Sequence, residues 1–120
     1  MRNVNERFAS QSVSGTTPIT FAKIDAQQLI TISFQAVFTD LAVGGTLKIQ
    51  MSNDPCAYGN TAGVFTPTNW TDIPNATATV TAGLGGIVSL QQVGYRWMRA
   101  IFTPSAGAGT CFVQFNAMGV

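Results

Sequence analysis

The sequence predicts an all-β protein, a single antiparallel β-sandwich of jelly-roll-like form with an N-terminal arm. Short runs rich in Thr, Val, Ile and Phe recur along the chain, separated by Gly, Pro, Asn and Asp. Apolar and polar residues alternate with period two inside these runs, which is the pattern of half-buried strands. No segment shows the 3.6-residue apolar spacing of an amphipathic helix. A chain of 120 residues fits one domain.

The predicted organisation is an arm at residues 1–15 followed by the sandwich at residues 16–120. The first fifteen residues contain little apolar material beyond Val4, Phe8 and Val13. A terminal segment with little to bury stays mobile unless something holds it in place. We therefore expect this arm to be mobile or docked on a neighbouring subunit, and not to belong to the core.

The first half of the sandwich contains three predicted strands. A weak one covers residues 19–24, and the strongest in the chain covers residues 30–38. The residues on one face of the latter are Ile30, Ile32, Phe34, Ala36 and Phe38. After the turn-like pair Gly44-Gly45, residues 46–51 alternate again. Their apolar positions are Leu47, Ile49 and Met51.

The second half contains four more predicted strands. Those at residues 76–81 and 87–90 are weak, whereas residues 97–102 and 110–118 alternate clearly. The expected core positions of the last two are Met98, Ala100, Phe102, Cys111, Val113, Phe115 and Ala117. The Gly- and Ala-rich residues 103–109 between them are expected to form a flexible loop.

Charged side chains are scarce. The chain has six Lys or Arg, five Asp or Glu and no His, so 9% of its residues are charged, against roughly 25% in an ordinary soluble domain. General acid–base catalysis and metal ligation depend mainly on His, Asp and Glu. We therefore expect a protein that is not an enzyme and has no cofactor and no metal site.

The same composition excludes other classes of function. The net charge is +1 and the isoelectric point is near 7.8, without the basic stripe that is typical of nucleic-acid binding. No apolar run approaches the ~20 residues of a membrane helix. The N-terminus lacks the apolar region of a secretion signal. If the protein reaches the outside of a cell, we expect it to be released with an assembly.

Low charge also indicates a surface that is partly covered. A free domain stays in solution through mixed surface charge, and sheets commonly guard their edge strands with charge. Here the outward strand positions carry mainly Thr, Ser and Gln, and Lys23 and Lys48 are almost the only strand lysines. We expect some strand edges to pair with other subunits.

One candidate contact site consists of Tyr95, Trp97 and Arg99. Tyr95 and Trp97 alternate with the expected core positions of their strand, so they are expected to face outward. Tyr, Trp and Arg are the residue types enriched at interface hot spots. We predict a subunit interface here, with packing in a second layer as the competing explanation.

A second candidate consists of Tyr58, Phe65 and Trp70 in the long connection at residues 52–75. Loops on a rigid scaffold often carry binding residues, so these aromatics are a candidate ligand or partner loop. Trp70 can equally close one end of the sandwich. Asp54, in the same connection, is expected to form a turn and not a calcium site, because one carboxylate supplies too few oxygen ligands.

The two cysteines, Cys56 and Cys111, are too few for a zinc site without His. Cys111 lies on an expected core face, and a free Cys behaves there as a small hydrophobe. We expect two unpaired thiols, and a disulfide is the alternative.

Three motifs resemble those of small β-sandwich structural proteins of bacterial viruses. They are the runs GTLKIQMSND at 45–54, NWTDIP at 69–74 and YRWMRA at 95–100. The resemblance covers residues 45–118, and residues 19–40 fit it by strand pattern only. The segment between Asp54 and Asn69 is longer than in that pattern. The resemblance implies a capsid decoration, minor capsid, head-fibre or tail accessory subunit, with no catalytic residues.

Together these observations predict a non-enzymatic virion subunit, a capsid decoration or minor capsid protein that forms homo-oligomers on the particle. Its expected partners are other copies of itself and virion proteins such as the major capsid or tail protein, with no nucleic acid and no membrane. The alternative is a carbohydrate- or receptor-binding module of a phage fibre or tail, acting through Tyr58, Phe65 and Trp70.

Overall fold

The computed structural model describes residues 3–27, 29–38, 44–55, 65–81, 85–91, 95–106 and 108–119. All regular structure in these ranges is β. No helix long and apolar enough to cross a membrane occurs in them. The strands are β1 (Asn3–Arg7), β2 (Gln11–Ser14), β3 (Ile19–Thr20), β4 (Ile24–Asp25), β5 (Leu29–Phe38), β6 (Gly44–Ser52), β7 (Thr71–Val80), β8 (Gly86–Leu90), β9 (Trp97–Ala106) and β10 (Ala108–Gly119).

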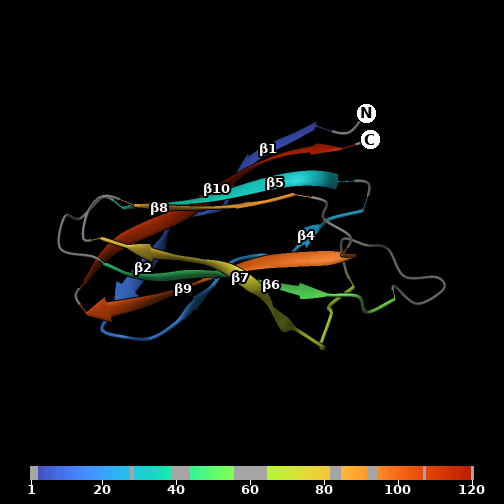
Figure 1. The fold of residues 1–120 in the computed structure, drawn as a ribbon. Helices are drawn as coiled ribbons and strands as arrows, with labels where there is room; N and C mark the ends of the chain where they lie inside the picture. The colour runs from blue at the N-terminus through green and yellow to red at the C-terminus, as the bar shows by residue number, and fades with distance from the viewer. Residues whose placement is uncertain are drawn as a thin grey trace.

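The strands form two antiparallel sheets that pack face to face (Figure 1). Sheet A has the order β1-β10-β5-β8, and β2 pairs with the first part of β10. Sheet B has the order β3-β9-β6-β7, and β4 pairs with the start of β9. The chain passes repeatedly from one sheet to the other. The predicted antiparallel β-sandwich is confirmed.

The inner faces of the two sheets form one hydrophobic core. Its largest fully buried side chains are Phe34, Phe102, Leu47, Ile49, Met98 and Val113. Burying a side chain of this size stabilises the fold by about 1.5–3 kcal/mol. The core faces predicted for residues 46–51, 97–102 and 110–118 are confirmed, because their apolar positions lie in this core or pack against it.

One end of β5 departs from the predicted alternation. Ile30 is 41% exposed, and its neighbour Leu29 is buried instead. The register with β10 shifts here. Thr31 pairs with Met118 and Leu29 pairs with Gly119, so β5 has one more residue than β10 at this point. Ile30 is therefore the extra residue of a β-bulge, which turns its side chain out of the core. The side chain of Phe38, predicted on the same face, lies outside the described part of the structure.

Residues 3–14 contain two strands of sheet A, which corrects the expectation of a separate arm at residues 1–15. β1 and β2 pair with successive parts of β10. Val13 is buried, and Phe8 stacks on Phe115 with 5.4 Å between ring centroids. An edge strand is held largely by its backbone hydrogen bonds, so it forms with few apolar side chains.

Two segments predicted as a turn and a loop belong to strands. Gly44-Gly45 opens β6, and residues 103–106 continue β9. The register between the two strands shifts at this point, and such a bulge also accommodates Pro104 within β9. A Cβ atom on Gly45 would lie 2.1 Å from the carbonyl oxygen of Thr103. This close approach of two backbones requires glycine.

The weaker predicted strands are present with different limits. The strand predicted at 19–24 is divided into β3 and β4, and both pair with β9. β7 begins at Thr71, five residues before the predicted start. Asn75 within it has a φ of 63°, a left-handed conformation that Asn tolerates better than most residues. This kink interrupts the alternation, so only the second half of β7 was evident from the pattern.

The two ends of the described chain lie side by side. Asn3 of β1 pairs with Met118 of β10 in antiparallel register. Figure 1 shows the N and C labels next to each other at one end of the sandwich. The chain therefore enters and leaves the fold along the same edge of sheet A.

Candidate functional site

The outer face of sheet B carries a second layer of side chains over β9. Trp97 points away from the core side occupied by Met98, yet it is only 1% exposed. Phe65 stacks on the Trp97 ring with 5.6 Å between centroids, and the Arg96 guanidinium carbon lies 4.3 Å from the ring centre. The Trp97 Nε1 donates a hydrogen bond of 3.0 Å to the carbonyl oxygen of Asp54. Trp97 is therefore covered by its own chain.

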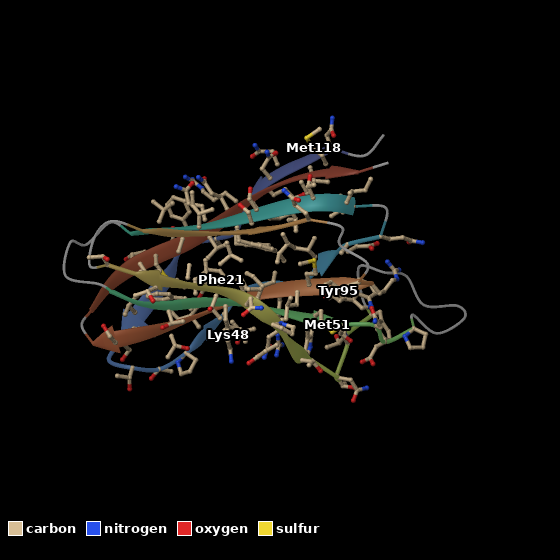
Figure 2. The ribbon with its side chains drawn as sticks, viewed as in Figure 1. Phe21, Lys48, Met51, Tyr95 and Met118 are labelled. Atoms are coloured by element: carbon tan, nitrogen blue, oxygen red, sulfur yellow. The ribbon has the colours of Figure 1, made fainter. Side chains whose placement is uncertain are left out.

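This packing corrects the prediction that Tyr95, Trp97 and Arg99 form one exposed stripe. Second-layer packing, the competing explanation, accounts for Trp97. Tyr95 precedes β9 and packs against the hydrophobic core (Figure 2). Arg99 is half-buried on the outer face. A subunit contact at these residues stays a prediction, and Trp97 has little surface left to offer to it.

The Asp54 carboxylate joins the two ends of the segment between β6 and β7. Its Oδ2 accepts hydrogen bonds from the backbone N–H groups of Thr68 (2.7 Å) and Asn69 (3.0 Å). Its Oδ1 accepts another from Nδ2 of Asn69 (2.8 Å). These bonds hold the pKa of Asp54 below its ordinary value of 3.8, and the Asn69 side chain has the largest effect.

These hydrogen bonds differ from the local turn that was predicted at Asp54. They reach residues 14 and 15 positions further along the chain. Because they fix the start of the approach to β7, they hold Phe65 and Trp70 against the outer face of sheet B. Asp54 is therefore a positioning residue for the second layer.

Trp70 lies over Arg99, so the predicted loop site and the predicted β9 site meet. The Arg99 guanidinium carbon is 4.2 Å from the centre of a Trp70 ring. The Trp70 Nε1 donates to the carbonyl oxygen of Pro67 (3.1 Å), and Arg99 Nε donates to Oε1 of Gln50 (2.9 Å). Burial lowers the pKa of Arg99 below its ordinary value. The guanidinium nevertheless stays protonated near neutral pH.

Gln50 extends this network to the edge of sheet B. Its Nε2 donates to Oδ1 of Asp72 (2.8 Å), and the Nζ of Lys48 lies 3.4 Å from the same carboxylate. The hydrogen bond from Gln50, followed by the charge of Lys48, holds the pKa of Asp72 below 3.8. Asp72 lies in β7 opposite Gln50. An exposed ion pair of this kind adds little stability.

Arg96 connects the start of β9 to β4. Its guanidinium forms an ion pair with Asp25, and its backbone N–H donates to Oδ1 of Asn53 (3.0 Å). The same guanidinium covers Trp97. The cluster therefore orients the second layer at this end of sheet B.

A hollow of about 340 Å³ opens beside Trp70 on this face. Its lining comes from the connection between β3 and β4, from the approach to β7 and from β9. The lining residues are Phe21, Ala22, Lys23, Thr66, Pro67, Trp70 and Arg99. We call this site the Trp70 hollow. It contains two cationic side chains and no carboxylate, and Tyr58, the third predicted loop residue, lies outside the described residues.

The outer face of sheet A carries uncharged polar side chains in register across its middle, and Arg7 of the edge strand β1 flanks them. Asn5, Asn116, Ser33 and Ser89 occupy paired positions on the four neighbouring strands. In the next row, Gln114 Nε2 donates to Oε1 of Gln35 at 2.8 Å. We call this surface the uncharged face. It consists of Asn5, Ser33, Gln35, Ser89, Gln114 and Asn116.

Most of the described charged residues lie on the side of sheet B, whereas the exposed large apolar residues lie on sheet A. The described charged residues on the side of sheet B are Lys23, Asp25, Lys48, Asp54, Asp72, Arg96 and Arg99. Those on sheet A are Glu6 and Arg7, both on the edge strand β1. The exposed large apolar side chains of the described chain are all on sheet A, and they are Ile30, Ile87 and Met118. Figure 2 shows Lys48 and Met118 on opposite sides of the sandwich.

The long edge strands are guarded unequally. β1 carries the charges of Glu6 and Arg7, and β7 carries Asp72 and Pro74, which are features that discourage pairing with another sheet. β8, with the sequence GIVSL, has no charge and no proline, and its Ile87 is 59% exposed. β8 therefore matches the unguarded edge expected from the composition.

Cys111 is buried in the core and is a free thiol. Burial raises the pKa of this thiol above its ordinary value of 9.0. Because the thiolate is the reactive form, we expect Cys111 to react slowly in the folded protein. Cys56 lies outside the described residues.

Two features of these surfaces were missed at the level of sequence. No spacing rule connects Asp54 to Thr68 and Asn69, because loop hydrogen bonds have no fixed period. The uncharged face was detectable in part, since Ser33 and Gln35 occupy the outward positions of a predicted strand. The missing information was the register that aligns them with Asn116 and Asn5.

No protein-family model matches the chain, and no curated protein sequence matches it. Among solved structures, it is similar to the PBSX exported protein XepA, with a TM-score of 0.70 and 16% identity. That match covers 98% of this chain and 37% of XepA, so the chain spans well under half of that protein. It is also similar to the SPBc2 prophage-derived protein YomS, with a TM-score of 0.54 and 8% identity over 97% of this chain and 92% of YomS. The protein thus shares its β-sandwich fold with these two prophage proteins.

Proposed function

We propose that the protein is a non-enzymatic structural subunit of a phage particle, a capsid decoration or minor capsid protein that assembles as a homo-oligomer. One observation carries this proposal, the separation of charge between the two sheets. Amide and hydroxyl groups cost less to remove from water than charged groups do. The uncharged face of sheet A is therefore the surface that is best suited to burial against another protein.

Two further features of sheet A support the same role. Ile87 and Met118 are 59% and 52% exposed, and both lie on this sheet. The edge strand β8, which contains Ile87, has unguarded backbone groups that can pair with a strand of another subunit. Apolar side chains beside hydrogen-bonding groups are the usual composition of a protein interface.

The fold neighbours support the phage context of the proposal. One is named as an exported protein of PBSX and the other as derived from the SPBc2 prophage. The proposed location is the virion, and the proposed partners are further copies of the chain and the major capsid or tail protein. Nucleic acid, membrane and cofactor have no part in this role.

The oligomeric state tests the proposal directly. We expect light scattering after size exclusion to show a homo-oligomer at micromolar concentration. Ser89→Lys places a charge on both the uncharged face and the β8 edge, so it is expected to shift the protein toward the monomer. Thr46→Lys is the matched control, because it adds the same charge at an exposed position of sheet B, and it is expected to leave assembly unchanged.

A second measurement addresses the particle itself. Cosedimentation with particles of the phage that encodes the chain is expected for the wild type and is expected to weaken in Ser89→Lys. A monomeric wild type that does not sediment with particles would contradict the proposal. Equal effects of Ser89→Lys and Thr46→Lys would show that the uncharged face is not the interface.

A further inference from the structure

The Trp70 hollow contains a cation that lacks a counterion among the described residues. Arg99 contacts the neutral side chain of Gln50 and the ring of Trp70. The nearby carboxylates are engaged elsewhere, since Asp72 is bonded to Lys48 and Gln50. No described carboxylate forms an ion pair with Arg99.

The Arg99 guanidinium is preorganised to bind an anion. Arg99 has lost part of its hydration, and removing a charge from water without a partner is costly. Its Nε donates to Gln50 and its guanidinium carbon lies over a Trp70 ring, so little side-chain freedom remains to be lost on binding. Lys23, which also lines the hollow, adds a second positive charge.

The shape and chemistry of the hollow limit the kind of ligand. Its volume of about 340 Å³ is at the small end of the roughly 300–1,000 Å³ found for small-molecule sites. Trp70 supplies an aromatic surface, and Thr66 supplies a hydroxyl group. A carboxylate is matched by the planar fork of arginine. The ligand therefore combines a carboxylate, hydroxyl groups and a compact ring with an apolar face.

We propose that the Trp70 hollow binds one acidic sugar unit, with its carboxylate on Arg99 and Lys23 and its ring against Trp70. An acidic protein side chain offers the carboxylate but not the flat face of C–H groups. A neutral sugar offers the face but not the charge. The proposal concerns the outer face of sheet B, so it does not depend on the assembly role proposed for sheet A.

Nuclear magnetic resonance of the ¹⁵N-labelled chain tests this site directly. The protein has two tryptophans, so two indole N–H signals are expected, and Trp70→Phe assigns them. Titration with digalacturonate is expected to shift the Trp70 indole and the Arg99 Nε–H signals along one saturable curve. A neutral galactose disaccharide and a protonated chitosan disaccharide, at the same concentration, are expected to produce no saturable shift.

Two substitutions, each of which removes one positive charge, distinguish binding in the hollow from long-range electrostatic attraction to the protein. Arg99→Gln is expected to weaken digalacturonate binding by about tenfold or more, which is about 1.4 kcal/mol. Lys48→Gln removes one positive charge from the same face outside the hollow, and is expected to change affinity by less than about twofold. Lys23→Gln provides a second test within the hollow if Arg99→Gln does not fold.

The opposite results would overturn the proposal. They are the absence of a saturable shift at millimolar digalacturonate, or an equal loss of affinity in Arg99→Gln and Lys48→Gln. Tighter binding of a glutamate-rich peptide than of digalacturonate, at the same signals, would assign the hollow to a protein partner. Each of these results leaves the oligomeric state unaffected, so failure here is distinguishable from failure of the assembly role.

Discussion

The ring of Phe65 lies against the ring of Trp97, with 5.6 Å between their centroids and 29° between their planes. This contact joins the approach to β7 to the start of β9, across the outer face of sheet B. It buries the large side chain of Trp97 on the outer face of a sheet, which is normally exposed to solvent in a β-sandwich. Phe65 is itself half-exposed, so the second layer is one side chain thick.

Phe65→Ala tests the cover over Trp97. We expect the free energy of unfolding to fall by less than the about 3–5 kcal/mol lost with a fully buried Phe, because Phe65 is only partly buried. In a Trp70→Phe background, the Trp97 emission is expected to move to longer wavelength. Phe112→Ala, at a partly buried position of sheet A, is the control and should leave the emission unchanged. An unchanged emission in Phe65→Ala would contradict the packing.

Asp54→Asn tests the hydrogen bonds that hold the second layer. The folded-state pKa of Asp54 is below 3.8, so the unfolded chain binds the proton first as the pH falls. The wild type therefore keeps this stabilisation above pH 3.8 and loses it as the pH falls from that value through the folded-state pKa. We expect urea unfolding to show a smaller loss on acidification in Asp54→Asn.

The matched control for this experiment is Thr68→Val. It removes a hydroxyl 3.5 Å from the Asp54 carboxylate but keeps the backbone donor at 2.7 Å. Its acid dependence is expected to follow the wild type. If Asp54→Asn and the wild type lose stability in parallel, the hydrogen bonds to Asp54 do not support the fold.

Gly45→Ala tests the close approach of β6 and β9. The added Cβ would lie 2.1 Å from the carbonyl oxygen of Thr103, so one of the two backbones must move. We expect a loss of about 1–3 kcal/mol in the free energy of unfolding. Gly15→Asn is the control, because a Cβ there meets open space and Asn tolerates the φ of 58°. An unchanged stability in Gly45→Ala would show that the two strands leave room for a Cβ atom at this bulge.

The reactivity of Cys111 tests its burial. In a Cys56→Ser background, we expect a disulfide reagent such as Ellman's to leave the folded protein unreacted at pH 8, because burial raises the pKa of the Cys111 thiol. One equivalent of thiol is expected to react in denaturant. Fast reaction of the folded protein would place Cys111 at the surface.

The core strands were predictable because burial on one face imposes a period of two. This rule was sufficient for Leu47 and Ile49 and for Phe102, which lie in the core as predicted. It was wrong at Ile30, because a bulge depends on pairing with β10 and leaves no mark in the alternation. It also missed β1, where backbone pairing forms a strand from the largely polar run NVNER.

The candidate site was predicted as two separate groups, and the structure joins them through two contacts, Phe65 on Trp97 and Trp70 on Arg99. The alternation of residues 97–102 correctly predicted that Trp97 points away from the core, but it could not show that Phe65 covers Trp97. That contact depends on Asp54 and Asn69, which are brought together by a loop and not by a repeat. The pairing of Trp70 with Arg99 has the same origin, since it joins two segments that lie far apart in sequence.

The pairing of Asn3 with Met118 has a consequence for how this unit can be combined with other polypeptides. Because the first and last strands end side by side, the sandwich can be inserted into a surface turn of a host protein without separating the two host residues that flank the insertion. The ends can likewise be joined by a short linker and new ends opened at another loop, giving a circular permutant with the same sheets. Anything fused to either terminus projects from that same end of the sandwich, opposite its far rim.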